Sequence, residues 1–424
     1  MDFKNVFTPN DQPTITYISR ENAKTEQKLK DYIDAKNMVV SICGPSKTGK
    51  TVLLRNSVNK ENLIPINGAS IRSIDDFYSC LFSFIDMPEE KTVTDSSQTT
   101  TSGTAGLGFN VGFGGLAALN AKSSGSVTDQ KQQTISQKTA SNPITIIISI
   151  LANTKYIIFI DDFHYIEKNI QSDVAKVIKS LAENGVKICT ASVPHRNDDV
   201  VRANAELRGR LATIDIPEWN ADELKAIATK GFVALNAEID PLVINNLVEE
   251  SFQSPQLMQA LCMNLCRIVN LRKSLDKMQK VSTNSEALLE AKKDTSDFAN
   301  FSSLVDALHS GPKIHGMERK QFDLTDGTQG DVYRAILLAM KSDPPSRHFS
   351  YDQIIQRVKD VCIKDTPTGS SISGSLSHIS DIAKDMAGGG KVLEWDDNIL
   401  TIIDPYFSFY LRSSDKLIKI SSVK

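Results

Sequence analysis

The sequence predicts an α/β protein with a phosphate-binding core on a parallel sheet, then a helical lid and a C-terminal winged helix. Three observations support this. A glycine-bearing loop follows a β-branched run at residue 44, and a second apolar run ends in two aspartates at 161–162. After residue 331, three segments with helical apolar spacing precede an alternating segment. Short apolar runs are typical of buried parallel strands, and apolar residues three and four apart are typical of helices.

Composition limits the class of protein. A length of 424 residues indicates roughly two to four domains. Because 48 Lys and Arg face 51 Asp and Glu, the net charge of -3 excludes a global basic field for nucleic acid. No long apolar stretch or leader-like start is visible, so we expect a cytoplasmic protein without membrane contact. The six scattered cysteines indicate buried thiols and no metal site.

The strongest motif is a phosphate loop. Residues 44–51 read GPSKTGKT and match G-x-x-x-x-G-K-[ST] in full, between a predicted strand at 38–43 and a predicted helix. Lys50 is expected to neutralise the β- and γ-phosphates of ATP, and the Thr51 hydroxyl to bind Mg2+. The expected nucleotide-binding residues of this loop are Gly44, Pro45, Ser46, Lys47, Thr48, Gly49, Lys50, Thr51 and Val52.

A second acidic site follows the apolar run at 156–160. Asp161 and Asp162 end this predicted parallel strand, and a phosphate loop needs such a carboxylate beside it to hold the metal. We expect Asp161 to hold Mg2+. Asp162 stands where many related enzymes carry a longer glutamate base, which predicts slow hydrolysis. The alternative is that the pair only caps the following helix.

Two further segments supply candidates. The strand at 186–193 is predicted to lie beside the phosphate-loop strand, so a hydroxyl of Thr190 or Ser192, with His195 just beyond, can sense the γ-phosphate. Ser192 is our candidate, and a hydroxyl satisfied by the backbone is the open alternative. Arg210 precedes the strand at 212–216. Because a planar guanidinium suits phosphate, Arg210 is our candidate for a catalytic arginine that acts across a subunit interface.

These residues resemble the STAND and archaeal-type ATPases, within the AAA+ and origin-recognition branch of P-loop proteins. The resemblance spans about residues 15–412 and rests on GPSKTGKT, FIDDFHYI, ELRGRL and SPQL. In that family a GxP motif places its proline against adenine, which implies this role for Pro255, although Ser254 replaces the usual glycine. Tyr17 and Arg20 lie where the family holds the nucleoside. The resemblance implies a regulatory ATPase that forms homo-oligomers, in prokaryotic antiviral defence or signalling.

We predict four regions along the chain. The AAA+-like core covers 1–217, with a Gly/Ser-rich insertion at about 92–142, and the helical lid covers 218–310. A linker at 311–330 leads to the winged helix at 331–424. Within it, helices are expected at 331–341, 351–361 and 373–386, and a β-hairpin around the turn at 396–398.

The charged residues of the predicted winged helix indicate which kind of ligand it contacts. From 331 to 412 there are 9 basic and 11 acidic residues, and Glu394, Asp396 and Asp397 lie at the predicted hairpin. A DNA-binding hairpin needs cations there, so we predict that this domain contacts a partner protein. Two alternatives stay open. One is a DNA-binding AAA+ loader or transposition-type ATPase; the other is a nucleotide-binding scaffold without hydrolysis, because Asp162 replaces glutamate.

The insertion has an unusual composition. No charged residue occurs from 96 to 121, and Leu107, Phe109, Val111 and Phe113 alternate with Gly or Asn. Composition alone favours a flexible linker, whereas the alternation is typical of a strand. Our hypothesis is that this segment forms a hairpin between subunits when ATP binds, with membrane insertion as a lesser alternative. An unchanged oligomer size after deletion of residues 102–126 would contradict the hypothesis.

Overall fold

The computed structural model describes residues 1–19, 24–85, 142–193, 204–313, 318–386 and 392–421. These residues form two compact units. The sheet unit comprises 24–43 and 53–214, and the helical unit comprises 1–23, 44–52 and 215–424. The predicted insertion and its intersubunit hairpin lie outside the described residues, as do Arg20 and His195.

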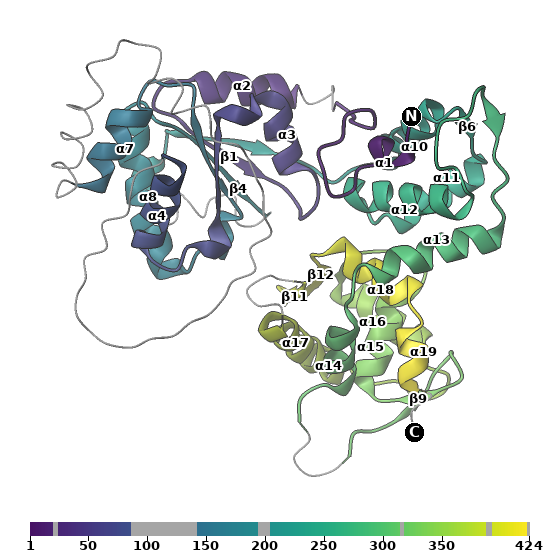
Figure 1. The fold of residues 1–424 in the computed structure, drawn as a ribbon. Coiled ribbons are helices and arrows are strands. Elements are labelled where there is room, and N and C mark those ends of the chain that lie inside the picture. The colour runs from purple at the N-terminus through teal and green to yellow at the C-terminus, as the bar shows by residue number, and fades with distance from the viewer. Residues whose placement is uncertain (20–23, 86–141, 194–203, 314–317, 387–391, 422–424) are drawn as a thin grey trace, which may run out of the picture. The chain divides into compact units, whose positions relative to one another are not determined.

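The sheet unit is built on five strands in the order β2-β3-β4-β1-β5. Figure 1 labels β1 and β4 of this sheet. These are β1 (Val39–Cys43), β2 (Leu63–Asn67), β3 (Ile157–Asp161), β4 (Lys187–Ser192) and β5 (Leu211–Asp215). The strands β2, β3, β4 and β1 pair in parallel. This confirms the predicted α/β class and the place of β4 beside the phosphate-loop strand; β2 was not predicted.

Helices cover both faces of this sheet. The elements are α2 (Thr25–Asp34), α3 (Lys50–Ser57), α4 (Ile74–Phe84), α7 (Pro143–Leu151) and α8 (Lys168–Glu183), with 3-10 turns η2 (Lys60–Asn62), η3 (Gly68–Ser70), η4 (Phe163–Tyr165) and η5 (Ala205–Leu207). Apolar side chains of α4, α7 and α8 share one cluster with alternate residues of β1 to β4. On the other side, α2 packs against β1 and β4. Because both faces are covered, the central strands β1, β3 and β4 are buried along almost their whole length.

The residues predicted to form a lid, called the lid region below, are a helix cluster around a core of their own in the helical unit. Its elements are α10 (Ala221–Ala234), α11 (Pro241–Glu250), α12 (Pro255–Ile268) and α13 (Ser285–Asp297), with the short strands β6 (Ala237–Glu238) and β7 (Gln279–Lys280). The N-terminal helix α1 (Phe3–Val6) joins this core. Gly231 makes the fit possible, since a Cβ atom there would lie 2.2 Å from the Phe7 ring.

The C-terminal module, residues 302–421, has a separate core. Its elements are α14 (Ser302–Ser310), β8 (Phe322–Asp323), β9 (Gln329–Gly330), α15 (Val332–Lys341), β10 (His348–Ser350), α16 (Tyr351–Asp360), α17 (Gly369–Met386), β11 (Leu393–Asp396), β12 (Ile399–Ile402), α18 (Pro405–Ser413) and α19 (Lys416–Ser421). The three predicted helices are present as α15, α16 and α17. The hairpin of β11 and β12 is confirmed, with Asp397 and Asn398 at φ 46° and 58° in its turn. Strand β10, which was not predicted, pairs with β12.

Buried charges join the lid region to the C-terminal module at the end of α18. Arg412 donates to both carboxylate oxygens of Glu250, each at 3.2 Å. The same guanidinium donates to the Lys341 carbonyl oxygen at 2.6 Å and to Asp343 at 2.8 Å. The Arg412 and Glu250 side chains are only 14% and 9% exposed. This largely buried pair therefore anchors α18 inside the helical unit.

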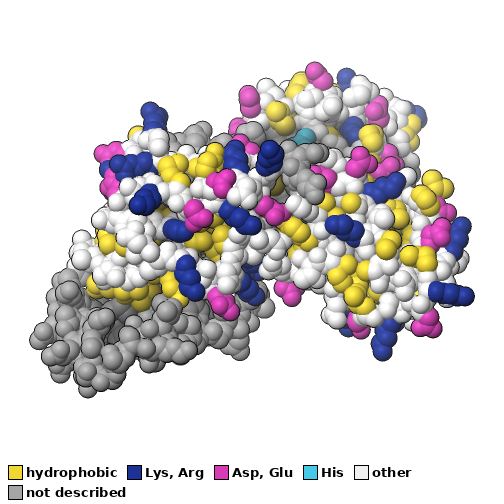
Figure 2. Space-filling model, turned by 90° about the horizontal axis from the view of Figure 1, so that it is seen from above, with side chains coloured by type: hydrophobic (Ala, Val, Ile, Leu, Met, Phe, Trp, Pro, Cys, Tyr) yellow, Lys and Arg dark blue, Asp and Glu magenta, His cyan; other side chains and the backbone are white. Residues whose placement is uncertain are grey.

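The described surface carries both signs of charge. Figure 2 shows Lys and Arg side chains interspersed with Asp and Glu on the face that it displays. Among the described residues, no helix is long and apolar enough to cross a membrane, and no cluster of His, Cys, Asp or Glu can hold a metal ion. All six cysteines are free thiols.

Candidate nucleotide site

The phosphate loop has a conformation that brings backbone N–H groups together. Lys47 and Gly49 have positive φ angles of 62° and 93°, whereas Thr48 between them does not. Such an alternation turns successive N–H groups to one side and forms an anion-binding concavity. Gly44 is needed for close backbone approach, because a Cβ atom there would lie 2.7 Å from the Ile216 carbonyl oxygen. The loop opens directly into α3 at Lys50, as predicted.

Side chains of the loop satisfy its own carbonyl groups. The buried Lys50 ammonium donates to the carbonyl oxygens of Gly44 and Pro45, both at 2.9 Å. The Thr48 hydroxyl also donates to Pro45, at 2.8 Å. From outside the loop, the Trp219 indole donates to the Thr48 carbonyl oxygen at 2.9 Å. Lys50 is thus held at the loop, where an incoming phosphate oxygen can replace a carbonyl oxygen as its acceptor.

The Lys47 side chain extends from the loop and contacts the start of α18 in the C-terminal module. Its ammonium lies 3.2 Å from an Asp404 carboxylate oxygen and 4.3 Å from the centre of the Tyr406 ring. Sequence reasoning assigned Lys47 only to phosphate binding. Sequence reasoning also missed Trp219, Asp404 and Tyr406 as neighbours of the loop, since nothing local links them to residues 44–51.

In the sheet unit, the predicted carboxylates stand at the carboxyl edge of the sheet. Ser41, Thr190 and Ile160 share one row across β1, β4 and β3, so Asp161 is one residue beyond that row. Because β1 runs in the same direction, its last residue Cys43 reaches the same edge, and the phosphate loop begins at the next residue. Within the sheet unit, β1 therefore ends at the edge where Asp161 lies.

Asp162 has an unusual backbone. Its φ of 54° is left-handed, and its N–H donates to a carboxylate oxygen of Asp161 at 3.1 Å. Gly68 makes room for this turn, because a Cβ atom there would lie 2.3 Å from the Asp162 carbonyl oxygen. Asp162 precedes η4, but its side chain makes no capping hydrogen bond. The sequence left open that Asp162 caps the following helix, but the structure has no hydrogen bond from that helix to the Asp162 side chain.

Buried hydroxyls lie on the two central strands. Ser192 pairs with Cys43 across β4 and β1, and is 3% exposed. Its hydroxyl, like those of Ser41 and Thr190, has no hydrogen-bond partner. Burying an unpartnered hydroxyl costs about 1–3 kcal/mol, so such groups need an explanation. Local backbone bonding, the open alternative for Ser192, is absent.

The other predicted contacts are more scattered. Arg210 forms an ion pair with Glu183 at 2.8 Å, within the sheet unit. In the helical unit, the Tyr17 carbonyl oxygen accepts from Lys230 at 3.1 Å, and the neighbouring Ile18 packs on the lid core. Pro255 is buried at the first position of α12, behind the N-cap Ser254. Their roles toward a nucleotide stay predictions.

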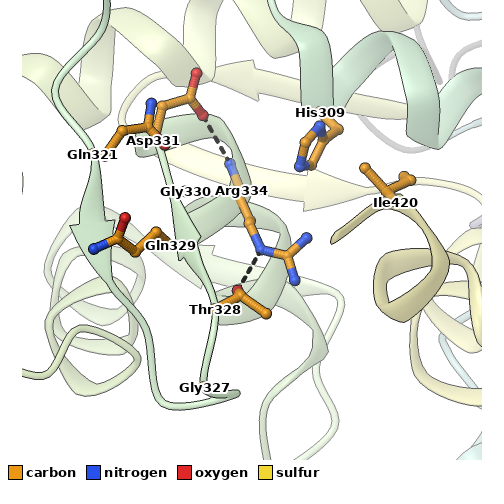
Figure 3. A pocket seen from close by; sticks show the side chains of 9 residues that line it. All are labelled: His309, Gln321, Gly327, Thr328, Gln329, Gly330, Asp331, Arg334 and Ile420. Carbon is orange, nitrogen blue, oxygen red and sulfur yellow. Dashed lines mark hydrogen bonds between the residues drawn. The ribbon is translucent and has the colours of Figure 1, made fainter. Parts of the chain in front are cut away.

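A cavity of about 450 Å3, lined mostly by residues with polar or charged side chains and by glycines, lies within the C-terminal module (Figure 3). The Arg334 side chain lines this cavity. Its guanidinium donates to the Thr328 hydroxyl, to an Asp326 carboxylate oxygen and to the Leu417 carbonyl oxygen. His309 faces the same space, and burial lowers the pKa of its imidazole, with a further contribution from Arg334. Because the cation is already satisfied by protein groups, we assign no ligand to this cavity.

No protein-family profile matches the sequence, and no curated protein matches it. The chain is similar to solved structures. The Walker-type ATPase PABY2304 of Pyrococcus abyssi has 12% identity and a TM-score of 0.47, covering 94% of this chain and 99% of that one. Cdc6p from Pyrobaculum aerophilum has 13% identity and a TM-score of 0.42, covering 99% and 98%. ORC2 from Aeropyrum pernix, in ADPNP and ADP complexes, has 10% identity and a TM-score of 0.47, covering 99% and 98%. At these values, function has to be argued from the residues of this chain.

Proposed function

We propose that the chain is an AAA+-type regulatory ATPase that binds ATP and hydrolyses it slowly with Mg2+. The observation that carries the proposal is the phosphate loop. Its alternating φ angles at Lys47 and Gly49 make an anion-binding concavity, and the Lys50 ammonium lies at that loop. This backbone geometry supports nucleotide binding, because the motif binds phosphate through converging N–H groups.

Each residue then has a chemical task. Backbone N–H groups of the loop bind phosphate oxygens, and Lys50 exchanges the Gly44 and Pro45 carbonyl oxygens for the β- and γ-phosphates. Mg2+ prefers oxygen ligands, and the Thr51 hydroxyl and Asp161 carboxylate are of that type. Bound Mg2+ neutralises phosphate charge. Asp162 orients the attacking water, Ser192 senses the γ-phosphate, and Arg210 acts on a neighbouring subunit after leaving Glu183.

We further propose that ATP changes the oligomeric state and so controls a partner protein, in prokaryotic defence or signalling. The resemblance to regulatory ATPases supports this, as does the shorter carboxylate at Asp162, which lengthens the lifetime of the ATP state. The C-terminal module acts as a winged helix that contacts protein. Its acidic hairpin, with Glu394, Asp396 and Asp397, disfavours duplex DNA as the ligand.

Replacing Lys50 tests the site. Lys50→Ala removes two charge-assisted hydrogen bonds to phosphate, which lowers ATP affinity roughly a hundredfold, for about 3 kcal/mol. Equilibrium titration with a fluorescent ATP analogue measures the affinity. The matched control is Lys60→Ala, an exposed lysine of η2. Normal ATP binding by Lys50→Ala would refute the site.

Solution mass tests the switch. Light scattering after size exclusion should give a larger species with ATP and Mg2+ than with ADP or without nucleotide. Asp162→Asn should hold the larger species for longer, because hydrolysis is blocked while ATP still binds. Multiple-turnover phosphate release by the wild type separates an ATPase from a scaffold without hydrolysis. Salt-dependent DNA binding would favour the loader alternative.

A further inference from the structure

Lys47 holds a backbone conformation that lysine rarely adopts. Its φ of 62° lies in the left-handed region, where the Cβ atom of a non-glycine residue meets its own backbone. Such a conformation persists only where the surrounding structure fixes it, and strained residues of this kind gather at functional sites. Glycine would adopt this angle freely. The chain therefore has a lysine at a position where glycine would adopt the backbone angle with less strain. We look for the compensating interaction in the contacts of the Lys47 side chain.

The side chain is fixed by the start of α18. One Asp404 carboxylate oxygen faces the Lys47 ammonium at 3.2 Å, while the other accepts from the Tyr406 N–H at 2.9 Å as the helix cap. With both oxygens engaged, Asp404 is locked in orientation. The Tyr406 ring lies 4.3 Å from the same ammonium, within cation–π range. Burial and the Asp404 charge raise the pKa of the Tyr406 phenol, so the ring carries no competing charge.

The segment before α18 is held in turn by the C-terminal module. The N–H groups of Ile403 and Asp404 both donate to the Val392 carbonyl oxygen, at 2.8 and 3.1 Å. The helix then buries Phe407 in the core of the module. Lys47 is thus tied to a rigid part of that module.

A second, independent connection reaches the next residue of the loop. The Trp219 indole donates to the Thr48 carbonyl oxygen. The preceding residue, Glu218, forms an ion pair with the buried Arg347, which directly precedes β10. A Glu218 carboxylate oxygen also lies 3.1 Å from the imidazole Nε2 of His348, the first residue of β10. Two consecutive residues of the phosphate loop, 47 and 48, are therefore linked to the C-terminal module by separate routes.

We propose that Asp404 and Tyr406 are positioning residues for the phosphate loop. Through Lys47 they keep the loop in its anion-binding conformation, so the place of α18 sets how fast nucleotide leaves. Coupling between two sites is reciprocal, so bound nucleotide stabilises the docking of α18 by the same factor. The inference rests on the proposed nucleotide binding and names the regulation of that site.

A double-mutant cycle on nucleotide release tests the proposal. Asp404→Asn keeps the helix cap, because asparagine caps as well as aspartate, but removes the charge that holds Lys47. We expect release of a fluorescent ADP or ATP analogue, measured by stopped flow with the full chain, to become roughly fivefold faster, as for loss of a partly exposed ion pair. Tyr406→Phe retains the ring and should release at the wild-type rate.

The second arm of the cycle replaces the lysine. Lys47→Gly lets the backbone adopt the left-handed angle without support, so release should stay within about twofold of wild type. In this background Asp404→Asn should have no further effect, and that lack of additivity marks the coupling. The control is Asp415→Asn, which removes the same charge from a different pair, with Lys293 at 3.3 Å.

The outcomes separate the two proposals. If the wild type binds no nucleotide, the proposed function fails. If the wild type binds nucleotide but Asp404→Asn releases it at the same rate, only the positioning role fails. Equal acceleration by Asp404→Asn with Lys47 and with Gly at residue 47 would also overturn the positioning role, because the effect would then not pass through Lys47.

Discussion

The two ends of α18 contact their surroundings in contrasting ways. At its C-terminal end, Arg412 and Glu250 are 14% and 9% exposed, and the guanidinium makes four hydrogen bonds. At its N-terminal end, Lys47 and Asp404 are 32% and 20% exposed and share one ion pair. Buried pairs are costly to break, whereas partly exposed pairs separate for little free energy. One end is therefore an anchor, and the other is a contact that can open.

The largest expected effect is at the anchor. Arg412→Met fills similar space but leaves Glu250 buried with only Lys292, at 3.5 Å. An uncompensated buried charge should lower the free energy of unfolding by about 3 kcal/mol. Chemical denaturation followed by circular dichroism measures this. The exposed Arg208→Met is the control, and a loss below about 1 kcal/mol would show that the anchor is no stronger than a surface pair.

A pH-dependent effect is expected at the second connection to the loop. The hydrogen bond from His348, with the charge of Arg347, lowers the pKa of Glu218 below its ordinary value, against the opposing effect of burial. A lowered pKa in the folded state means that the stabilisation is present above the unfolded pKa and is lost as the pH falls toward the folded pKa.

Glu218→Gln should remove this acid-side dependence. We expect the wild type to lose under about 1 kcal/mol through Glu218 as the pH falls below about 4.5, since the Glu218 side chain is 29% exposed although Arg347 is buried. The variant should show a flatter profile in denaturation titrations across that range. Glu249→Gln, an exposed carboxylate of α11, is the control and should keep the wild-type profile.

The smallest effect on stability is expected at the contact that can open. Asp404→Asn should lower the free energy of unfolding by less than about 0.5 kcal/mol, because the cap is retained and the lost pair is partly exposed. The same denaturation experiment measures this change. A loss as large as that of Arg412→Met would remove the distinction between the two ends of α18.

Much of the site could be predicted because its signals are local. The loop at 44–51, the strand before Asp161 and the strand before Ser192 each show their class within a few residues. The hairpin could be predicted in the same way, since Asp397 and Asn398 are residue types that tolerate a left-handed turn without contacts from distant segments. In these segments the sequence and the backbone conformation agree.

The rest depends on contacts between distant segments. Lys47 has the same kind of φ angle as Asn398, yet its support comes from Asp404, more than three hundred residues later. Trp219 reaches Thr48 in the same non-local way, and Phe7 packs under Gly231. No periodicity or motif in a single sequence reports such pairs. A lysine at an angle that favours glycine becomes informative only once the angle is known.

The length of α18 turns it into a lever. Nine residues rise about 13.5 Å, so a tilt of roughly 10° about the Arg412 end carries the Asp404 end through about 2 Å. That displacement is enough to part an ion pair that begins at 3.2 Å. A partner that rotates the C-terminal module by roughly 10° about the Arg412 end would therefore break the ion pair between Lys47 and Asp404.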